Sequence, residues 1–215
     1  METIYAVING DDTDGEKIRQ AGEILKAGGL VAFPTETVYG LGGDALNPES
    51  SRKIYAAKGR PSDNPLIVHI CRWEDIYRIA DPVPEAAQRL CEAFWPGPLT
   101  MIVWKNDRVP YETTGGMDTV AIRMPKHPVA LRLIEGSGCL IAAPSANTSG
   151  KPSPTEASHV ALDMDGRIPM ILDGGPVGIG IESTIVDLSE ETPMILRPGY
   201  ITQEMLQEVL GEEVR

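Results

Sequence analysis

The residues between positions 58 and 69 combine two cations, a turn and a histidine that follows an apolar run. Lys58 and Arg60 stand two positions apart, at the end of a helical pattern that stops at Gly59. A turn-rich stretch containing Asn64 then leads into the apolar residues before His69. Two fixed cations beside a strand end suit a polyphosphate or a carboxylate, because arginine binds such groups as a fork and lysine as a point charge.

Three further segments share this design, in which an apolar run leads into a polar loop. They are PTETVYGLG at residues 34–42, PSANTSG at residues 144–150, and ESTIVD at residues 182–187, which is followed by RPG at residues 197–199. In open α/β sheets, ligands bind where loops leave the strand ends. Small hydroxyls, amides and backbone N–H groups in such loops can bind phosphate oxygens without adding bulk. The four segments together predict one site for an anionic ligand.

Each segment alone also has a simpler interpretation. Proline, serine, asparagine and glycine are ordinary loop residues, and cations near a helix C-terminus interact favourably with the helix dipole. His69 could be a hydrogen-bonded histidine at the end of a strand, and His127 and His159 do not group with it as metal ligands. The sequence contains no Walker-type phosphate loop, no complete dinucleotide fingerprint, no nucleophile elbow and no H-E-x-x-H zinc motif.

Periodicity predicts an alternation of helices and strands that would position these loops. Helices are expected at residues 15–27, 48–58, 73–80, 84–94, 128–136 and 202–210, and residues 105–118 are expected to form a loop. Strands are expected at residues 30–33, 66–70, 99–104, 119–124, 140–143, 170–172, 184–188 and 194–196. We therefore predict a single α/β domain over residues 1–215, with a twisted, mixed parallel and antiparallel sheet flanked by helices.

Composition excludes several classes of protein. The 31 acidic and 19 basic side chains give a net charge of −12, so the chain lacks the basic footprint of a nucleic-acid binder. The acidic runs at residues 11–14 and 187–191 and at the C-terminal end are expected to be solvated surface. Three cysteines without C-x-x-C spacing predict neither a disulfide framework nor a zinc site. Without a signal peptide or a long apolar run, we expect a cytoplasmic protein with no membrane contact.

The motifs as a set resemble the YrdC-like family, the threonylcarbamoyl-AMP synthases. The resemblance covers about residues 10–205 in the family's order and includes its K-x-R and S-x-N pairs, here Lys58-x-Arg60 and Ser145-x-Asn147. It implies a YrdC/RibB-like sheet with a large concave cationic cavity. Some family members carry a second, C-terminal domain, and we expect this chain to be the single-domain form.

The resemblance also implies a reaction. Such enzymes convert L-threonine, bicarbonate and ATP to L-threonylcarbamoyl-AMP and pyrophosphate. A downstream tRNA threonylcarbamoyl-transfer enzyme then modifies the adenosine next to the anticodon. Mg²⁺ would be carried with the ATP phosphates and would need no dedicated protein site, and direct tRNA binding is expected to be weak or absent. The alternatives are an RNA-binding module and a related carbamoyl-adenylate-forming protein.

Family roles transfer to individual positions of this chain as expectations. The threonine-binding residues would be Thr37, His69, Arg123, Ala143 and Ser183. The ATP-binding residues would be Arg60, Asn64, Thr119, Ser145, Ser153 and Arg197. The catalytic residues would be Lys58, Arg60, Ser145 and Asn147, and no metal-ligating residue is expected.

Overall fold

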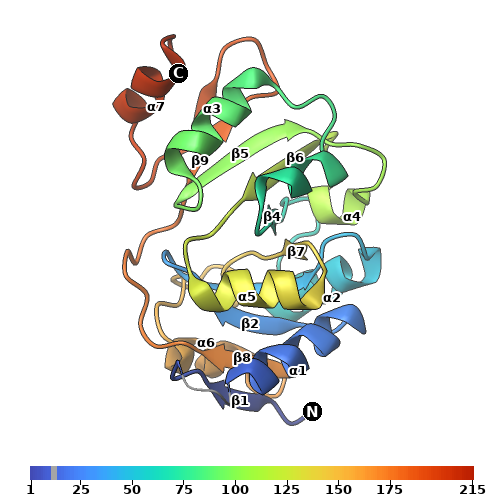
Figure 1. The fold of residues 1–215 in the computed structure, drawn as a ribbon. Helices are drawn as coiled ribbons and strands as arrows, with labels where there is room; N and C mark the ends of the chain where they lie inside the picture. Colours follow the sequence, from blue (N-terminus) through green and yellow to red (C-terminus); the bar gives the residue numbers. More distant parts are fainter. Residues whose placement is uncertain (11–13) are drawn as a thin grey trace.

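One sheet runs the length of the molecule (Figure 1). The computed structural model describes residues 1–10 and 14–215. Within them the strands are β1 (Ile4–Val7), β2 (Val31–Pro34), β3 (Tyr39–Asp44), β4 (Ile67–His69), β5 (Leu99–Trp104), β6 (Thr119–Arg123), β7 (Ile141–Ala142), β8 (Met170–Asp173), β9 (Thr184–Asp187) and β10 (Met194–Arg197). Their order in the sheet is β1-β8-β2-β3-β7-β4-β6-β5-β9-β10. Parallel pairs such as β4 and β6 occur beside antiparallel pairs such as β2 and β3, so the predicted mixed sheet is confirmed.

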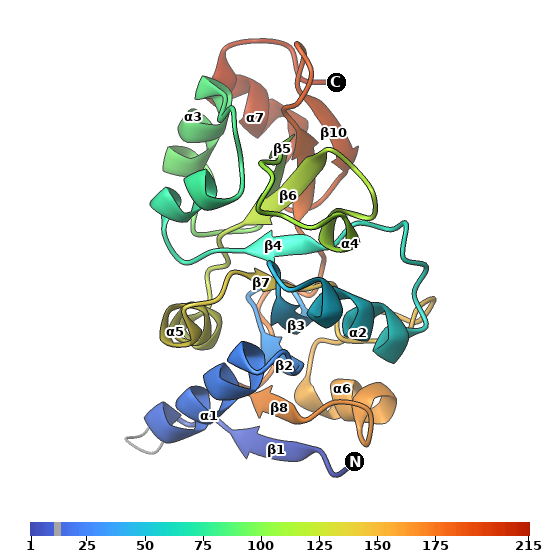
Figure 2. The same ribbon diagram turned by 90° about the vertical axis from the view of Figure 1, so that its right-hand side faces the viewer.

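The helices flank this sheet, as the sequence predicts (Figures 1 and 2). In the described residues they are α1 (Asp14–Lys26), α2 (Pro48–Lys58), α3 (Glu85–Phe94), α4 (Tyr111–Thr114), α5 (Pro128–Ser137), α6 (Ala157–Met164) and α7 (Gln203–Leu210), together with a 3₁₀ helix (Trp73–Arg78). Figure 2 shows α1 and α5 on one side of the strands β8 and β2, with α6 and α2 on the other.

Two groups of strands meet at the middle of the sheet. We call β1, β8, β2, β3 and β7 the lower half and β4, β6, β5, β9 and β10 the upper half, as they stand in Figure 1. The ladder that joins the halves consists of two residue pairs between β4 and β7, Val68 with Ala142 and His69 with Ile141.

Alternation along the strands divides the buried side chains between two core clusters, because successive side chains point to opposite faces. In β2, Val31 and Phe33 pack in the cluster that contains residues of α1 and α5, whereas Ala32 lies in the other cluster. In the upper half, Val68 and Ile122 pack in the cluster that contains residues of α3 and α7. The opposite face of the upper strands is left for the cavity described below.

Helix α2 positions the two cations of the opening motif. It begins at Pro48 after Asn47, whose side chain accepts a hydrogen bond from the Glu49 N–H at 3.0 Å. It ends at Gly59, which adopts a left-handed conformation with φ of 60°. Both ends are as predicted, because an asparagine cap, a proline in the first turn and a glycine at the C-terminus are strong local signals. Lys58 is thus the last helical residue, and Arg60 leaves the helix in a new direction.

Strand β3 was not predicted, because three of its six residues are glycines, which weaken strand propensity. Close approach of neighbouring chains explains them. A Cβ atom on Gly42 would lie 2.7 Å from Ile141 Cγ2 and 2.8 Å from Phe33 Cε1, which is closer than real Cβ contacts. Glycine is required at this position by packing across the sheet, which a single strand's sequence does not reveal.

Other elements were missed, or differ in detail from the prediction. Strand β1 and helices α4 and α6 were not predicted, and α4 interrupts the expected loop at residues 105–118. A helix is present within residues 73–80 as predicted, and it is the 3₁₀ helix Trp73–Arg78. Helix α5 continues through Gly136 and is capped by Gly138, whose φ is 66°.

Asp14 is a correction to the expectation of a solvated acidic run. Its side chain is fully buried and accepts hydrogen bonds from the N–H groups of Asn9, at 3.2 Å, and Gly10, at 2.6 Å. A buried carboxylate is tolerated when it is hydrogen-bonded in this way. The rest of that run, residues 11–13, lies outside the described residues.

A pair of glycine substitutions tests the packing of β3. Gly42→Ala should lower the free energy of unfolding by about 1–3 kcal/mol, because the new methyl group must displace Phe33 or Ile141. Gly136→Ala should raise it by about 0.5–1 kcal/mol, because Gly136 is helical and has open space around its Cα. Urea denaturation measures both, and effects of the same sign would contradict the packing described.

Candidate functional site

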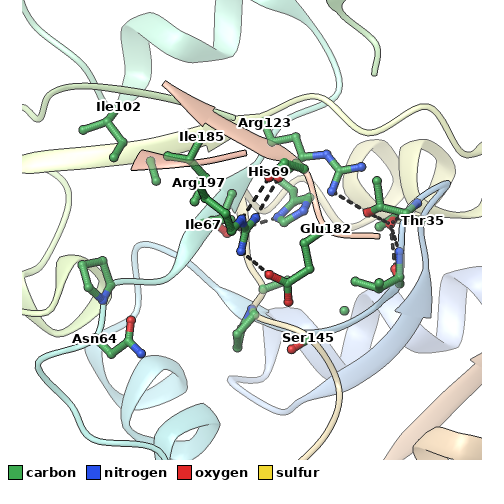
Figure 3. Close-up of a pocket in the computed structure, with 18 of the residues that line it drawn as sticks. Thr35, Asn64, Ile67, His69, Ile102, Arg123, Ser145, Glu182, Ile185 and Arg197 are labelled. Carbon is green, nitrogen blue, oxygen red and sulfur yellow. Dashed lines mark hydrogen bonds and ion pairs between the residues drawn. The ribbon is translucent and has the colours of Figure 1, made fainter. Parts of the chain in front are cut away.

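A cavity of about 460 Å³ lies against the upper half of the sheet and is bordered by loops of the lower half. The apolar side chains Ile67, Ala121, Ile102 and Ile185, from β4, β6, β5 and β9, form part of its lining. Figure 3 shows Arg123, His69, Arg197 and Glu182 gathered beside these isoleucines. The cavity therefore combines an apolar surface with a cluster of charged and polar groups.

The structure brings together most of the residues that the sequence singles out. Those that line the cavity are Thr37, Arg60, Asn64, His69, Arg123, Ala143, Ser145, Ser183 and Arg197. Four others are placed beside it. Lys58 and Asn147 are buried behind Ser145, and Ser153 donates a hydrogen bond to the lining residue Glu182. Thr119 lies on the same face of β6 as Ala121 and Arg123, further from the centre of the cavity.

Arg123 is a buried cation at one end of the cavity, with 4% of its surface exposed. Its Nη2 lies 2.6 Å from Glu36 Oε1, and its Nη1 donates to Thr37 Oγ1 at 2.9 Å. Its Nε donates to the Gly97 carbonyl at 3.3 Å. Burial lowers the pKa of Arg123 and Glu36 opposes that shift, so the guanidinium stays charged. Arginine has five N–H groups, so donors remain for a ligand carboxylate.

His69 is buried and neutral in this site. Its Nδ1 lies 3.1 Å from the Ile67 carbonyl, which can only accept, so Nδ1 donates in this contact, and the backbone of Ile141 is a second hydrogen-bond partner of the ring. The ring packs edge-on against Phe33, with 6.1 Å between the ring centroids. Burial, followed by the charge of Arg123, lowers the pKa of His69 to about 3.

The Arg197 guanidinium lies opposite, at the end of β10, and is held by two residues of the segment before β9. It forms an ion pair with Glu182, and its Nη2 donates to Ser183 Oγ at 3.1 Å. Ser183 Oγ also lies 2.7 Å from Thr100 Oγ1, and Glu182 accepts from Ser153 Oγ at 2.8 Å. These contacts join the strands β5, β9 and β10 to the loop that contains Ser153.

Lys58 braces the loop that follows β7. Its ammonium donates to the carbonyl oxygens of Ser145 and, at 2.5 Å, of Asn147. Asn147 Nδ2 in turn donates to the carbonyls of Thr148, at 2.9 Å, and Lys151, at 2.8 Å. Burial, followed by the charge of Arg60, lowers the pKa of Lys58 to about 8. Lys58 and Asn147, which were predicted to be catalytic, thus hold in place the loop that carries Ser145 in the wall of the cavity.

Arg60 borders the other end of the cavity. Its Nη2 donates to the Pro65 carbonyl at 3.0 Å, and its Nε to the Asn64 carbonyl at 3.4 Å. Asn64 itself is exposed at the rim. Arg60 and Arg197 therefore supply positive charge beside the apolar surface, while Arg123 supplies it beside His69.

Two acidic residues of the site were not predicted. Glu36 pairs with Arg123, and Glu182 pairs with Arg197. Both lie inside motifs that the sequence analysis singled out, but neither glutamate was assigned a role there. The arginines of the other motifs could have indicated them, because a buried cation needs a counter-charge and each of these two motifs contains a glutamate.

Two kinds of feature are absent from the described residues. Residues 1–10 and 14–215 contain no helix that is both long and apolar enough to cross a membrane. The same part of the chain holds no cluster of three or more His, Cys, Asp or Glu side chains arranged to bind a metal ion.

Comparison with known proteins identifies the family. The model of the Sua5/YciO/YrdC family, described as "Telomere recombination", matches residues 23–199. The chain therefore belongs to this family, and the resemblance predicted from the motifs is confirmed.

Relatives of known name support this result. The chain is 56% identical over 200 residues to the threonylcarbamoyl-AMP synthase of Bacillus subtilis and 55% identical over 196 residues to that of Pyrococcus abyssi. The alignments cover 93% and 91% of this chain, which spans 58% of the length of each relative. The crystal structure of P. abyssi Sua5 complexed with L-threonine matches with a TM-score of 0.94 at 50% identity, covering 100% of this chain and 63% of that one.

The buried neutral state of His69 predicts an acid-sensitive stability. The folded pKa of about 3 lies below the ordinary value of 6.5, so the unfolded chain takes up the proton first as the pH falls. Stability is therefore present above pH 6.5 and is lost as the pH falls toward 3. Between about pH 7.5 and about pH 5, wild type should lose about 2 kcal/mol more of its unfolding free energy than His69→Gln.

Urea denaturation at the two pH values measures this difference. His159→Gln, at an exposed position of α6, is the matched control and should behave as wild type does. Equal losses in wild type and His69→Gln would show that His69 is not held neutral in the folded protein.

Proposed function

We propose that the chain forms L-threonylcarbamoyl-AMP from L-threonine, bicarbonate and ATP, with release of pyrophosphate. The observation that carries the proposal is a single cavity in which Arg123, His69 and Thr37 adjoin the two further cations Arg60 and Arg197. The relatives named threonylcarbamoyl-AMP synthase support it, as does the threonine complex of P. abyssi Sua5.

The end of the cavity near Arg123 suits threonine. Arg123 would bind the substrate carboxylate, because its guanidinium is buried and already oriented by Glu36 and Thr37. His69 would form a hydrogen bond with the threonine hydroxyl. A site that reads a hydroxyl through buried polar groups rejects analogues that lack it, since those groups would be left unpaired.

The end near Arg60 and Arg197 suits ATP. Its two guanidinium groups would bind phosphate oxygens, and Ser145 lines the same cavity. The apolar side chains Ile102 and Ile185 offer a surface for the nucleotide's base or sugar. Mg²⁺ would enter with ATP as part of the substrate, held mainly by phosphate oxygens.

The chemistry needs no protein nucleophile. The threonine amine adds to the carbon of bicarbonate, a C–O bond of bicarbonate breaks, and the departing hydroxyl leaves as water with a proton from the amine, which gives a carbamate. A carbamate oxygen then attacks the α-phosphorus of ATP, and pyrophosphate leaves with the electron pair of the broken P–O bond. The chain would hold the two substrates at reacting distance and would stabilise the charge on the phosphates through Arg60 and Arg197.

The product would serve a second enzyme. We propose that a tRNA threonylcarbamoyl-transfer enzyme takes the activated group to the adenosine beside the anticodon, and that both act in the cytoplasm. The net charge of −12 favours weak or no direct binding of tRNA by this chain.

Pyrophosphate release tests the proposal. Wild-type protein supplied with ATP, threonine and bicarbonate should release pyrophosphate, and omission of threonine or bicarbonate should abolish it. 2-Aminobutyrate, which is threonine without the hydroxyl, should be at least ~100-fold poorer in kcat/KM. Release that is independent of threonine would overturn the assignment, and salt-sensitive RNA binding without turnover would favour the RNA-binding alternative.

Removal of either cation of the K-x-R pair should slow turnover. Lys58→Ala and Arg60→Ala should each lower kcat by at least ~100-fold. The first removes the hydrogen bonds that hold the loop of Ser145, and the second removes positive charge beside the ATP phosphates. Arg52→Ala, on the exposed side of the same helix, is the matched control and should retain wild-type turnover. Unchanged turnover in both variants would refute their assigned roles.

Glu182 should oppose ATP binding, because it neutralises Arg197 and would face the incoming phosphates. Glu182→Gln is expected to lower the KM for ATP by at least ~3-fold while leaving the KM for threonine unchanged. Glu190→Gln removes the same charge from the exposed surface and should change neither constant. A higher KM for ATP in Glu182→Gln would mean that Glu182 instead orients Arg197 and Ser153 for binding.

A further inference from the structure

The chain between β8 and β9 joins the lower half of the sheet to the upper half (Figure 1). We call its first part, residues 174–180, the connector. Four of these seven residues are glycines, which have little conformational preference of their own. The path of the connector must therefore be fixed by the groups that it binds.

The hydroxyl of Tyr39 holds the start of the connector. The Tyr39 side chain is fully buried, and its Oη donates a hydrogen bond to the Gly175 carbonyl at 2.6 Å. The same oxygen accepts a hydrogen bond from the Gly174 N–H at 3.2 Å. Removal of this one oxygen would take a hydrogen-bond partner from two backbone groups of the connector.

The loop between β2 and β3 holds the far end of the connector. The Ile179 N–H donates to the Glu36 carbonyl at 2.9 Å, and the Gly180 N–H donates to the Thr37 carbonyl at 3.1 Å. Tyr39 is the first residue of β3 and follows this loop directly. Both ends of the connector are therefore bound to one short stretch of chain, residues 36–39.

The residues that bind the far end of the connector are the ones that orient Arg123. Glu36 forms the ion pair with Arg123, and Thr37 Oγ1 accepts a hydrogen bond from its Nη1. The two hydrogen bonds from the connector hold the backbone from which both side chains project. Tyr39 does not itself line the large cavity, so its effect on a ligand there must pass through these neighbours.

We propose that Tyr39 is a positioning residue for the threonine end of the cavity and that it acts through the connector. The inference rests on the proposed function, in which Arg123 binds the threonine carboxylate. With the hydroxyl in place, the connector keeps Glu36 and Thr37 where they orient the Arg123 guanidinium. Without it, the glycine-rich connector separates from these residues more often, and threonine binds more weakly.

Tyr39→Phe tests the link, because it removes the hydroxyl and keeps the buried ring. Hydrogen exchange followed by NMR should find that the amides of Ile179 and Gly180 exchange at least ~5-fold faster than in wild type. The matched control is Tyr111→Phe, which removes an exposed hydroxyl that donates to Asp118 at 2.8 Å. The control should leave the exchange of both amides unchanged.

Steady-state kinetics separate a positioning role from general damage to the fold. In Tyr39→Phe the KM for threonine should rise at least ~3-fold. The KM for ATP should rise by a smaller factor, because Arg60 is held by the carbonyls of Asn64 and Pro65 and not by the connector. Tyr111→Phe should keep both constants at their wild-type values.

Gly180→Ala provides a second test that leaves the buried Tyr39 intact. Gly180 has a φ of 77°, which is unfavourable for alanine, and a Cβ atom there would meet no other atom within 4 Å. The variant should therefore loosen the far end of the connector without disturbing the core. It should raise the KM for threonine by a larger factor than the KM for ATP.

Unchanged exchange of the Ile179 and Gly180 amides in folded Tyr39→Phe would overturn the proposal. So would an equal rise in both KM values, or an unchanged KM for threonine in both variants. The exchange measurement needs no substrate. Failure of the proposed function would therefore appear separately, as wild-type protein without threonine-dependent turnover.

Discussion

The buried guanidinium of Arg123 connects the two halves of this molecule. Arg123 belongs to β6 in the upper half, and its partners Glu36 and Thr37 lie in the loop between β2 and β3 in the lower half. A cation with only 4% of its surface exposed must be paired, since an isolated buried charge is very costly. The need to neutralise Arg123 therefore determines where the β2–β3 loop lies, and with it one wall of the cavity.

The other walls of the cavity are likewise held by ion pairs and by hydrogen bonds to loop carbonyl groups. Glu182 holds Arg197 at the far side, and Lys58 holds the loop after β7 by two carbonyl oxygens. Each brace joins segments that are distant in the sequence. A chain with net charge −12 can thus keep three arginines around one cavity, because their counter-charges and carbonyl acceptors are part of the wall. The proposed reaction depends on this arrangement, since it relies on positioned cations and not on a nucleophile.

Local signals were enough to predict much of the fold and of the site. The ends of α2 follow from Asn47 and Gly59, and the four motif loops meet at one cavity as their shared design predicts. Strand β3 was missed because its glycines reflect contact with Ile141 and Phe33 from other strands. The burial of Asp14 and the Glu36–Arg123 pair were missed for the same reason. Each depends on a partner that only the folded chain brings near, so no local pattern records it.

Calorimetric titration of L-threonine into wild type and Arg123→Lys tests the central claim most directly. Lysine keeps the charge at Arg123 but cannot donate to Glu36, Thr37 and a ligand carboxylate in a planar fork. The account predicts that threonine affinity falls at least ~10-fold, while circular dichroism shows the variant to be folded. Threonine binding with unchanged affinity in the folded variant would contradict the placement of the substrate carboxylate at Arg123.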